Sequence, residues 1–160
     1  MIANFAILTR LLFPRDEIKV ILDLGSREGH QAIAFSKMYP KAQVFGFECN
    51  PSSLEKARHN TSHLANVTIV GMAAHAVDGR CKFYPIDTKN TVSPYQDGNP
   101  GASSLFLASG KYDRIEKYVQ DEIEVVATRL DTWASTLGIA RFDLVWMDLQ
   151  GAELLALEGM

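Results

Sequence analysis

The feature that most constrains this chain is a short apolar segment that runs directly into a glycine-bearing turn. Residues Val20–Leu24 read Val-Ile-Leu-Asp-Leu, and the turn Gly25-Ser26-Arg27-Glu28-Gly29 follows at once. A continuous apolar run of this length is typical of a strand that is buried on both faces of a parallel sheet. Apolar residues then recur at helical spacing up to Tyr39, and Pro40 ends the segment. The sequence therefore predicts a strand, a tight turn and a helix.

The same alternation continues along the chain. Residues Ala42–Phe47 predict a second strand, and Val67–Val70 predict a third. Between them, Asn50 is placed to cap a helix that has Pro51 at its first position and runs to about Leu64. A strand-helix-strand-helix-strand order implies an α/β fold with a mostly parallel sheet and right-handed crossovers.

The pattern changes in the second half of the chain. Residues 80–86 and 122–128 are predicted to be antiparallel partners, so we expect an inserted β-hairpin. The irregular residues 87–110 between them are rich in Pro, Gly, Asn and Ser. A loop this long in a compact domain is usually functional or mobile, so we predict a mobile active-site loop. A helix over 130–137, a strand over 142–147 and a helix over 152–159 complete the predicted elements.

The length of the chain predicts a single domain over residues 1–160, with residues 1–17 forming an amphipathic helix packed on it. With the parallel strands in the order third-second-first-fourth, residues 142–147 form an exposed edge. An apolar edge promotes aggregation unless something pairs with it. We therefore expect either that the domain continues past Met160, so that the present sequence is C-terminally truncated, or that a further molecule, such as a second copy, covers the edge.

Composition excludes several classes of partner. The net charge of −3 gives no basis for nucleic-acid binding, and no apolar run is long enough to span a membrane. The two cysteines, Cys49 and Cys81, have no neighbouring cysteine, so neither a metal site nor a disulfide framework is expected. Cysteine usage of this kind favours a reducing compartment, and we predict the cytoplasm.

The glycine turn and an acid one strand further on describe a site for a nucleoside cofactor. Gly25 permits a tight turn and close approach of a ligand to the backbone, and Gly29 opens a helix whose first N–H groups can receive polar ligand atoms. Glu48 lies 23 residues after Gly25, near the offset of about 20 at which dinucleotide folds place a ribose-binding acid. The structural alternative is an ordinary strand-helix turn with an acid at a helix N-terminus.

Two kinds of nucleoside cofactor are bound by sites of this type, NAD and S-adenosylmethionine. The dinucleotide pattern G-x-G-x-x-G is not met, because Arg27 stands two positions after Gly25 and Gly29 stands four positions after it. Glu28 would also repel a pyrophosphate. S-adenosylmethionine has no phosphate, carries a sulfonium cation and tolerates an acid such as Asp23. The residues favour S-adenosylmethionine, and an NAD-dependent oxidoreductase remains the alternative.

Further motifs extend this pattern over most of the chain. They are Ile21-Leu22-Asp23-Leu24-Gly25, Val44-Phe45-Gly46-Phe47-Glu48-Cys49-Asn50-Pro51, Gly101-Ala102-Ser103-Ser104-Leu105, and Asp148-Leu149-Gln150-Gly151-Ala152-Glu153. In these motifs the chain resembles the FkbM-type family of S-adenosylmethionine-dependent methyltransferases from about Val20 to the last residue. The family often has Glu at the position of Gln150 and Lys at that of Trp146.

The resemblance implies a Rossmann-like class I methyltransferase sheet with helices on both faces. It also implies cofactor-binding roles for residues at the ends of the first three strands. The methionine portion would be wrapped by Asp23, Gly25, Ser26 and Gly29. The ribose hydroxyls would bind Glu48, the adenosine would be flanked by Cys49 and Asn50, and the adenine ring would border on Ala73 and Ala74.

The acceptor side of the predicted site is less determined. Asp148 follows the fourth parallel strand, where an acid can orient or deprotonate a hydroxyl nucleophile, or can simply cap the next helix. Glu153 suits a substrate role or a favourable position on the helix dipole. Ser103 and Ser104 either close over cofactor or substrate or satisfy turn backbone.

The resemblance implies O-methylation of a hydroxyl group on a small molecule or sugar. A non-catalytic domain that keeps the cofactor pocket for binding or interaction is the second alternative.

Overall fold

The computed structural model describes residues 14, 16–111 and 113–160. The predicted helix over residues 1–17 lies almost wholly outside the described residues. The other predicted elements all fall within them.

A four-stranded parallel sheet forms the centre of the fold. Its strands run in the order β3-β2-β1-β7, as the sequence predicts, and each neighbouring pair is parallel. In the register of the sheet, Leu22 lies opposite Phe45 on one side and Val145 on the other. The strands are β1 (Val20–Leu24), β2 (Gln43–Phe47), β3 (Val67–Val70) and β7 (Leu144–Met147).

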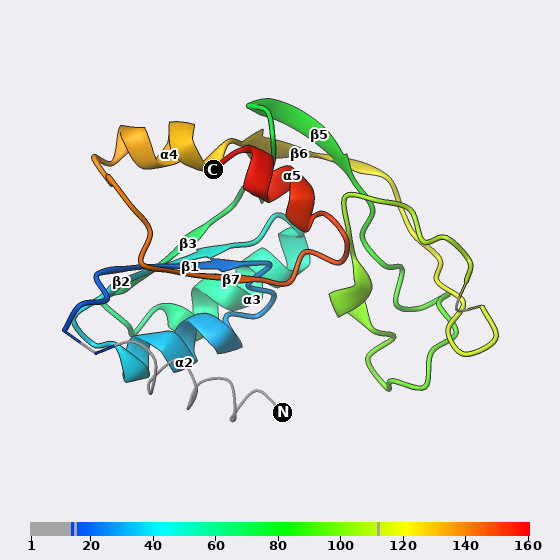
Figure 1. The fold of residues 1–160 in the computed structure, drawn as a ribbon. Coiled ribbons are helices and arrows are strands. Elements are labelled where there is room, and N and C mark those ends of the chain that lie inside the picture. Colours follow the sequence, from blue (N-terminus) through cyan, green and yellow to red (C-terminus); the bar gives the residue numbers. More distant parts are fainter. Residues whose placement is uncertain (1–13, 15, 112) are drawn as a thin grey trace.

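Helices cover both faces of this sheet. Figure 1 shows two helices below it, α2 (His30–Met38) and α3 (Pro51–Thr61). Above it lie α4 (Leu130–Thr136) and α5 (Glu153–Glu158). The start of α3 is the predicted one, since the Asn50 side chain accepts a hydrogen bond from the Ser52 amide at 3.3 Å.

Alternate residues of the strands point into two hydrophobic cores, one on each face of the sheet. Because both faces are buried, the central strands are continuous apolar runs in the sequence. Ile21 and Val44 pack with Phe35 of α2 on one face. On the other face, Trp133 of α4 contacts the rings of Phe45 and Phe47 edge-on, each at a centroid distance of 4.9 Å. The helices are therefore fixed to the sheet by side chains that point to opposite faces.

The predicted hairpin is part of a second sheet. The strands β5 (Gly79–Phe83) and β6 (Ile123–Thr128) pair antiparallel, as expected, but β4 (Ala73–Ala74) also pairs with β6, in parallel. Two alanines carry no recognisable strand pattern, so the sequence did not reveal this third strand. Residues 84–122 connect β5 to β6 and contain the short helix η1 (Pro100–Ala102). The mobility of this connection stays a prediction.

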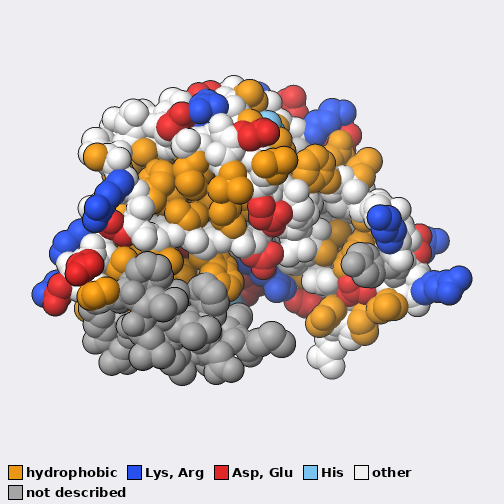
Figure 2. All heavy atoms as spheres, in the orientation of Figure 1, with side chains coloured by type: hydrophobic (Ala, Val, Ile, Leu, Met, Phe, Trp, Pro, Cys, Tyr) orange, Lys and Arg blue, Asp and Glu red, His pale blue; other side chains and the backbone are white. Residues whose placement is uncertain are grey.

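Strand β7 is the edge of the four-stranded sheet among the described residues, as predicted. Hydrophobic side chains gather over it and between it and α4 in Figure 2. Phe142, Val145 and Met147 belong to the partly buried rim of the core there. The prediction that a further segment or a second copy covers this edge stays a prediction.

Gly25 is required where the ends of β1 and β7 meet. The Asp148 amide donates to the Leu24 carbonyl at 2.9 Å, which draws the two strand ends together. A Cβ atom on Gly25 would lie 2.1 Å from the Asp148 carbonyl oxygen, and the φ angle of Gly25 is +84°. No side chain is compatible with both conditions, so this glycine sets how closely the strand ends approach.

Substitution Gly25→Ala is expected to destabilise the fold far more than Gly138→Ala. Both glycines have a positive φ angle, but a Cβ on Gly138 meets nothing within 4 Å. Gly138→Ala should therefore cost about 1 kcal/mol from backbone strain alone, whereas Gly25→Ala should cost at least about 2 kcal/mol more because β7 must move. Urea unfolding of the two variants measures the difference, and equal losses would contradict the argument.

Candidate functional site

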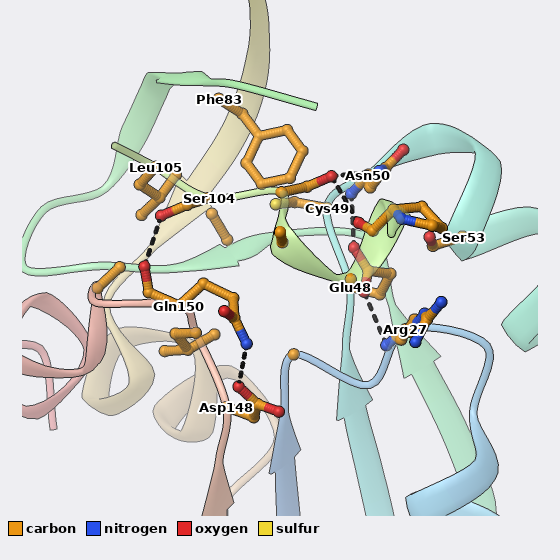
Figure 3. A pocket seen from close by; sticks show the side chains of 18 of the residues that line it. Arg27, Glu48, Cys49, Asn50, Ser53, Phe83, Ser104, Leu105, Asp148 and Gln150 are labelled. Carbon is orange, nitrogen blue, oxygen red and sulfur yellow. Dashed lines mark hydrogen bonds between the residues drawn. The ribbon is translucent and has the colours of Figure 1, made fainter. Parts of the chain in front are cut away.

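A cavity of about 330 Å³ lies at the carboxyl ends of the parallel strands. Ligand sites in open α/β sheets occupy this position, and the volume falls within the range of small-molecule pockets. The turn after β1, the start of α3 and the end of β7 form its floor and sides, and residues 99–105 of the long connection form the opposite wall. Figure 3 shows the side chains of these segments directed toward one another.

The structure brings most of the predicted site residues together at this cavity. Those that line it are Gly25, Glu48, Cys49, Asn50, Ala73, Ala74, Ser103, Ser104 and Asp148. The predicted residues that do not line it are Asp23, Ser26, Gly29 and Glu153. Each of these four has a structural contact that explains its position.

Glu48 is the most constrained polar group of the cavity. One carboxylate oxygen accepts from the Arg27 amide at 2.8 Å and the other accepts from the Asn50 amide at 2.7 Å. The residue is only 9% exposed. Burial raises its pKa to about 7, although the amides of Asn50, Arg27 and Cys49 act in the opposite direction. Because each carboxylate oxygen has two lone pairs, Glu48 keeps capacity for a further donor, such as a ribose hydroxyl.

Four of the five backbone amides of the glycine turn, those of Gly25, Ser26, Arg27 and Gly29, are occupied within the protein. Those of Gly25 and Ser26 both donate to the Phe47 carbonyl, at 3.0 and 2.9 Å. The Gly29 amide donates to the Ser26 carbonyl at 2.8 Å, and Glu48 holds that of Arg27. The amide of Gly29 itself is therefore not open to a ligand, and the role expected for the first N–H groups of the helix that follows stays a prediction. This turn does not provide the cluster of open amides that a pyrophosphate requires.

Gly29 instead allows two helices to pack. Its φ angle is +83°, and a Cβ there would lie 3.0 Å from a methyl group of Thr61 at the end of α3. Asp23 lies fully buried beneath the turn, where it accepts a hydrogen bond from the Ser26 hydroxyl at 2.7 Å. Burial raises the pKa of Asp23 to about 6. Asp23 and Ser26 thus brace the turn from below.

The segment after β7 separates the roles of its two acids. Glu153 holds the turn, since its carboxylate accepts from the Leu149 amide at 2.8 Å and from the Gly151 amide at 3.3 Å. Asp148 makes no such contact with backbone amides. It lies exposed at the cavity and accepts from the Gln150 side-chain amide at 2.5 Å, as Figure 3 shows. Asp148 does not cap α5 (Glu153–Glu158), because Ala152 is the N-cap residue and the helix has no side-chain cap.

Ser103 and Ser104 hold the wall of the cavity in place. The Ser103 hydroxyl donates to the Pro100 carbonyl at 2.7 Å and accepts from the Ile86 amide at 3.0 Å. The Ser104 hydroxyl donates to the Gln150 carbonyl at 3.0 Å, which ties the wall to the turn after β7. Both serines thus line the cavity and satisfy turn backbone.

Several residues of the cavity are not evident from the sequence. Arg27, Asn99 and Gln150 line it with left-handed backbone, at φ angles of 51°, 56° and 53°. Backbone held in this region is uncommon for residues with a side chain and is often associated with functional sites. Arg27 pairs with Asp97 at 2.8 Å, which joins the glycine turn to the opposite wall. No local motif marks these positions, because tertiary contacts impose their conformation.

A family model describes most of this chain. The model of the Methyltransferase FkbM domain matches residues 23–160, which include every residue of the cavity. The chain belongs to the FkbM methyltransferase domain family. The resemblance seen in the sequence motifs is therefore confirmed.

Two curated proteins are similar to the chain. The 2-O-methyltransferase NoeI of Sinorhizobium fredii (strain NBRC 101917 / NGR234) is 33% identical over 135 residues, covering 84% of this chain and 54% of that protein. AMB antimetabolite synthetase AmbE of Pseudomonas aeruginosa is 25% identical over 165 residues, covering 88% of this chain and 8% of that protein. The chain thus spans about half the length of the first relative and a small part of the second.

A solved structure of the family also matches. The methyltransferase FkbM of Methylobacillus flagellatus KT superposes with a TM-score of 0.49 at 14% identity, over 89% of this chain and 28% of that one.

Within residues 14, 16–111 and 113–160, no group of three or more His, Cys, Asp or Glu side chains is placed to hold a metal ion. None of the helices in the same part of the chain has the length and apolar character needed to cross a bilayer.

The pKa of Glu48 predicts a pH-dependent stability of the ligand-free protein. Its folded value of about 7 lies above the ordinary 4.5, so between these values the unfolded chain loses the proton first. The contribution of Glu48 should therefore fall by roughly 3 kcal/mol as the pH rises from 4.5 to above 7. Urea unfolding from pH 4.5 to 8 measures this change together with that of Asp23, whose pKa is also raised. Glu48→Gln should remove the Glu48 part of it and leave the part of Asp23. An unchanged pH profile in the variant would contradict the assignment.

Proposed function

We propose that the chain is the catalytic domain of an S-adenosylmethionine-dependent methyltransferase that methylates a hydroxyl group of a small molecule or sugar. The observation that carries the proposal is the buried Glu48 carboxylate at the cavity, with capacity for a further hydrogen-bond donor, in a chain of the FkbM family. The name of NoeI, a 2-O-methyltransferase, supports oxygen as the atom that is methylated.

The charges of the cavity favour a cationic cofactor. Glu48 and Asp148 are the acids among its lining residues, and Arg27 is already paired with Asp97. When bound, S-adenosylmethionine supplies a methyl group on a positively charged sulfur. Acidic groups favour that charge and disfavour a pyrophosphate, and the occupied amides of the glycine turn act in the same direction. These features argue against the NAD-dependent alternative.

The cavity also has an apolar side that suits an adenine ring. Cys49, Ala73 and Ala74 line it together with Phe83. Burial raises the pKa of the Cys49 thiol, so this side chain stays neutral. We assign the adenine to this side, the ribose hydroxyls to Glu48 and the methionine portion to the backbone at Gly25. Asp23, Ser26 and Gly29 support these positions from outside the cavity.

Asp148 is the group we assign to the acceptor hydroxyl. One of its carboxylate oxygens is held by Gln150, and no described residue donates to the other. That second oxygen can accept the proton of a hydroxyl and so align the hydroxyl oxygen for attack. A non-catalytic binding domain would have no use for this arrangement. The location in the cytoplasm stays a prediction.

Binding of S-adenosylhomocysteine tests the cofactor assignment. We expect calorimetry to show binding of this nucleoside and none of NAD. Glu48→Gln should weaken it about tenfold, because a charged acceptor of the ribose hydroxyls becomes neutral. Glu55→Gln, at an exposed acid of α3, is the matched control and should bind as the parent does. Preference for NAD, or equal affinity in both variants, would refute the assignment.

Asp148→Asn tests the role of the second acid. The substitution keeps the size of the side chain and leaves an oxygen for Gln150, but it removes the proton-accepting group. We expect methyl transfer to slow by about a hundredfold, the range of general base catalysis. Affinity for S-adenosylhomocysteine should change by less than about threefold. Transfer at the parent rate would exclude Asp148 as the base.

A further inference from the structure

The cavity has a polar cluster that the cofactor assignment leaves unused. Asn99 and Tyr118 line the cavity, and Glu116 connects them. The Glu116 carboxylate accepts from the Asn99 side-chain amide at 3.2 and 3.3 Å and from the Tyr118 hydroxyl. The Ser93 hydroxyl donates to it at 2.7 Å. These donors lower the pKa of Glu116, the Tyr118 hydroxyl most of all, so the carboxylate stays charged.

Glu116 determines how the Asn99 side chain lies. An amide oxygen facing a carboxylate would be repelled, so the amide nitrogen must face Glu116. That nitrogen also donates to the Tyr118 hydroxyl at 3.2 Å. The remaining group of Asn99 is its side-chain oxygen, to which no residue in the described part of the chain donates. The Tyr118 hydroxyl donates its hydrogen bond to Glu116, and its oxygen keeps a lone pair that can accept from a ligand.

Other side chains of the cavity also have hydrogen-bond acceptors without a donor. Asp148 has one carboxylate oxygen that accepts from no described residue, and Gln150 uses its amide nitrogen on Asp148. Arg27, the cation among the lining residues, has its charge balanced by Asp97, which takes one of its guanidinium nitrogens. Apart from the other N–H groups of Arg27, the groups left for a ligand are mainly oxygen acceptors beside negative charges. They suit a molecule that presents several O–H donors and carries no negative charge.

We infer that Asn99 and Tyr118, oriented by Glu116, form a subsite for a neutral, polyhydroxylated acceptor. The inference rests on the proposed methyl transfer and adds the residues that select the acceptor and the charge that the acceptor must lack. Asn99 and Tyr118 bind the hydroxyl groups that are not methylated. Glu116 is a positioning residue, since it acts through the other two.

Labelled methyl transfer from S-adenosylmethionine to matched sugars tests the subsite. The neutral probes are the methyl glycosides of glucose and galactose. The anionic probes, the uronides, are the methyl glycosides of glucuronic and galacturonic acid. We expect the neutral glycosides to have at least a tenfold higher kcat/KM than the uronides. The two sets differ only at C6, where a carboxylate replaces a hydroxymethyl group. The neutral C6 amides of the same uronides should react better than the uronides, which separates the effect of the negative charge from that of the lost hydroxyl.

Variants of the cluster test the named residues. Asn99→Gly keeps the left-handed backbone while removing the amide, Tyr118→Phe removes only the hydroxyl, and Glu116→Gln removes only the charge. Each should raise the KM for the neutral glycosides about five- to tenfold, the effect of one lost hydrogen bond, with kcat within about twofold. Affinity for S-adenosylhomocysteine should not change. Gln96→Ala, at an exposed neighbour in the same connection, should leave all values unchanged.

The outcomes separate this inference from the function on which it rests. If the protein fails to bind S-adenosylhomocysteine, the proposed function is refuted. Binding without transfer to any neutral glycoside refutes the subsite alone. So does transfer that prefers uronides or is indifferent to the three variants. An equal loss of S-adenosylhomocysteine affinity in Asn99→Gly would assign the cluster to the cofactor instead.

Discussion

The contact between the ends of β1 and β7 is the constraint on which the site depends. The Asp148 amide bonds to the Leu24 carbonyl, and only a glycine at position 25 leaves room for the Asp148 carbonyl. This contact brings the glycine turn beside the acid that follows β7, although Asp148 stands 123 positions after Gly25 in the sequence. The floor of the cavity is therefore a consequence of how closely two parallel strands pack.

Glu48 links the stability of the site to its function. In the ligand-free protein it joins two segments of backbone, at the Arg27 amide and the Asn50 amide, and burial opposes its charge. Hydroxyl donors from a bound ribose would favour the charged form and offset part of that cost. The side chain that holds the two backbone segments in place is thus also the one whose charged form the proposed cofactor would stabilise.

The long connection between β5 and β6 has a defined structural role. It supplies one wall of the cavity and is joined to the sheet at separate points, through Asp97 to Arg27 and through Ser104 to Gln150. Two of these partners, Arg27 and Gln150, have left-handed backbone. A wall held by a few polar contacts can vary in sequence without disturbing the sheet, which suits a surface that selects the acceptor.

The sequence by itself determined the strands and helices of the parallel sheet, because apolar runs, caps and glycine turns act over a few residues. The expected strand order follows from the strand-helix alternation and its right-handed crossovers. The sequence also identified Gly25, Glu48 and Asp148, since each follows directly from the end of a predicted strand. It did not reveal β4, the occupied amides of the glycine turn, or the grouping of Asn99, Glu116 and Tyr118. Only the tertiary structure decided these features, because they depend on contacts between segments far apart in the sequence, where no local pattern reports which hydrogen-bonding groups remain free.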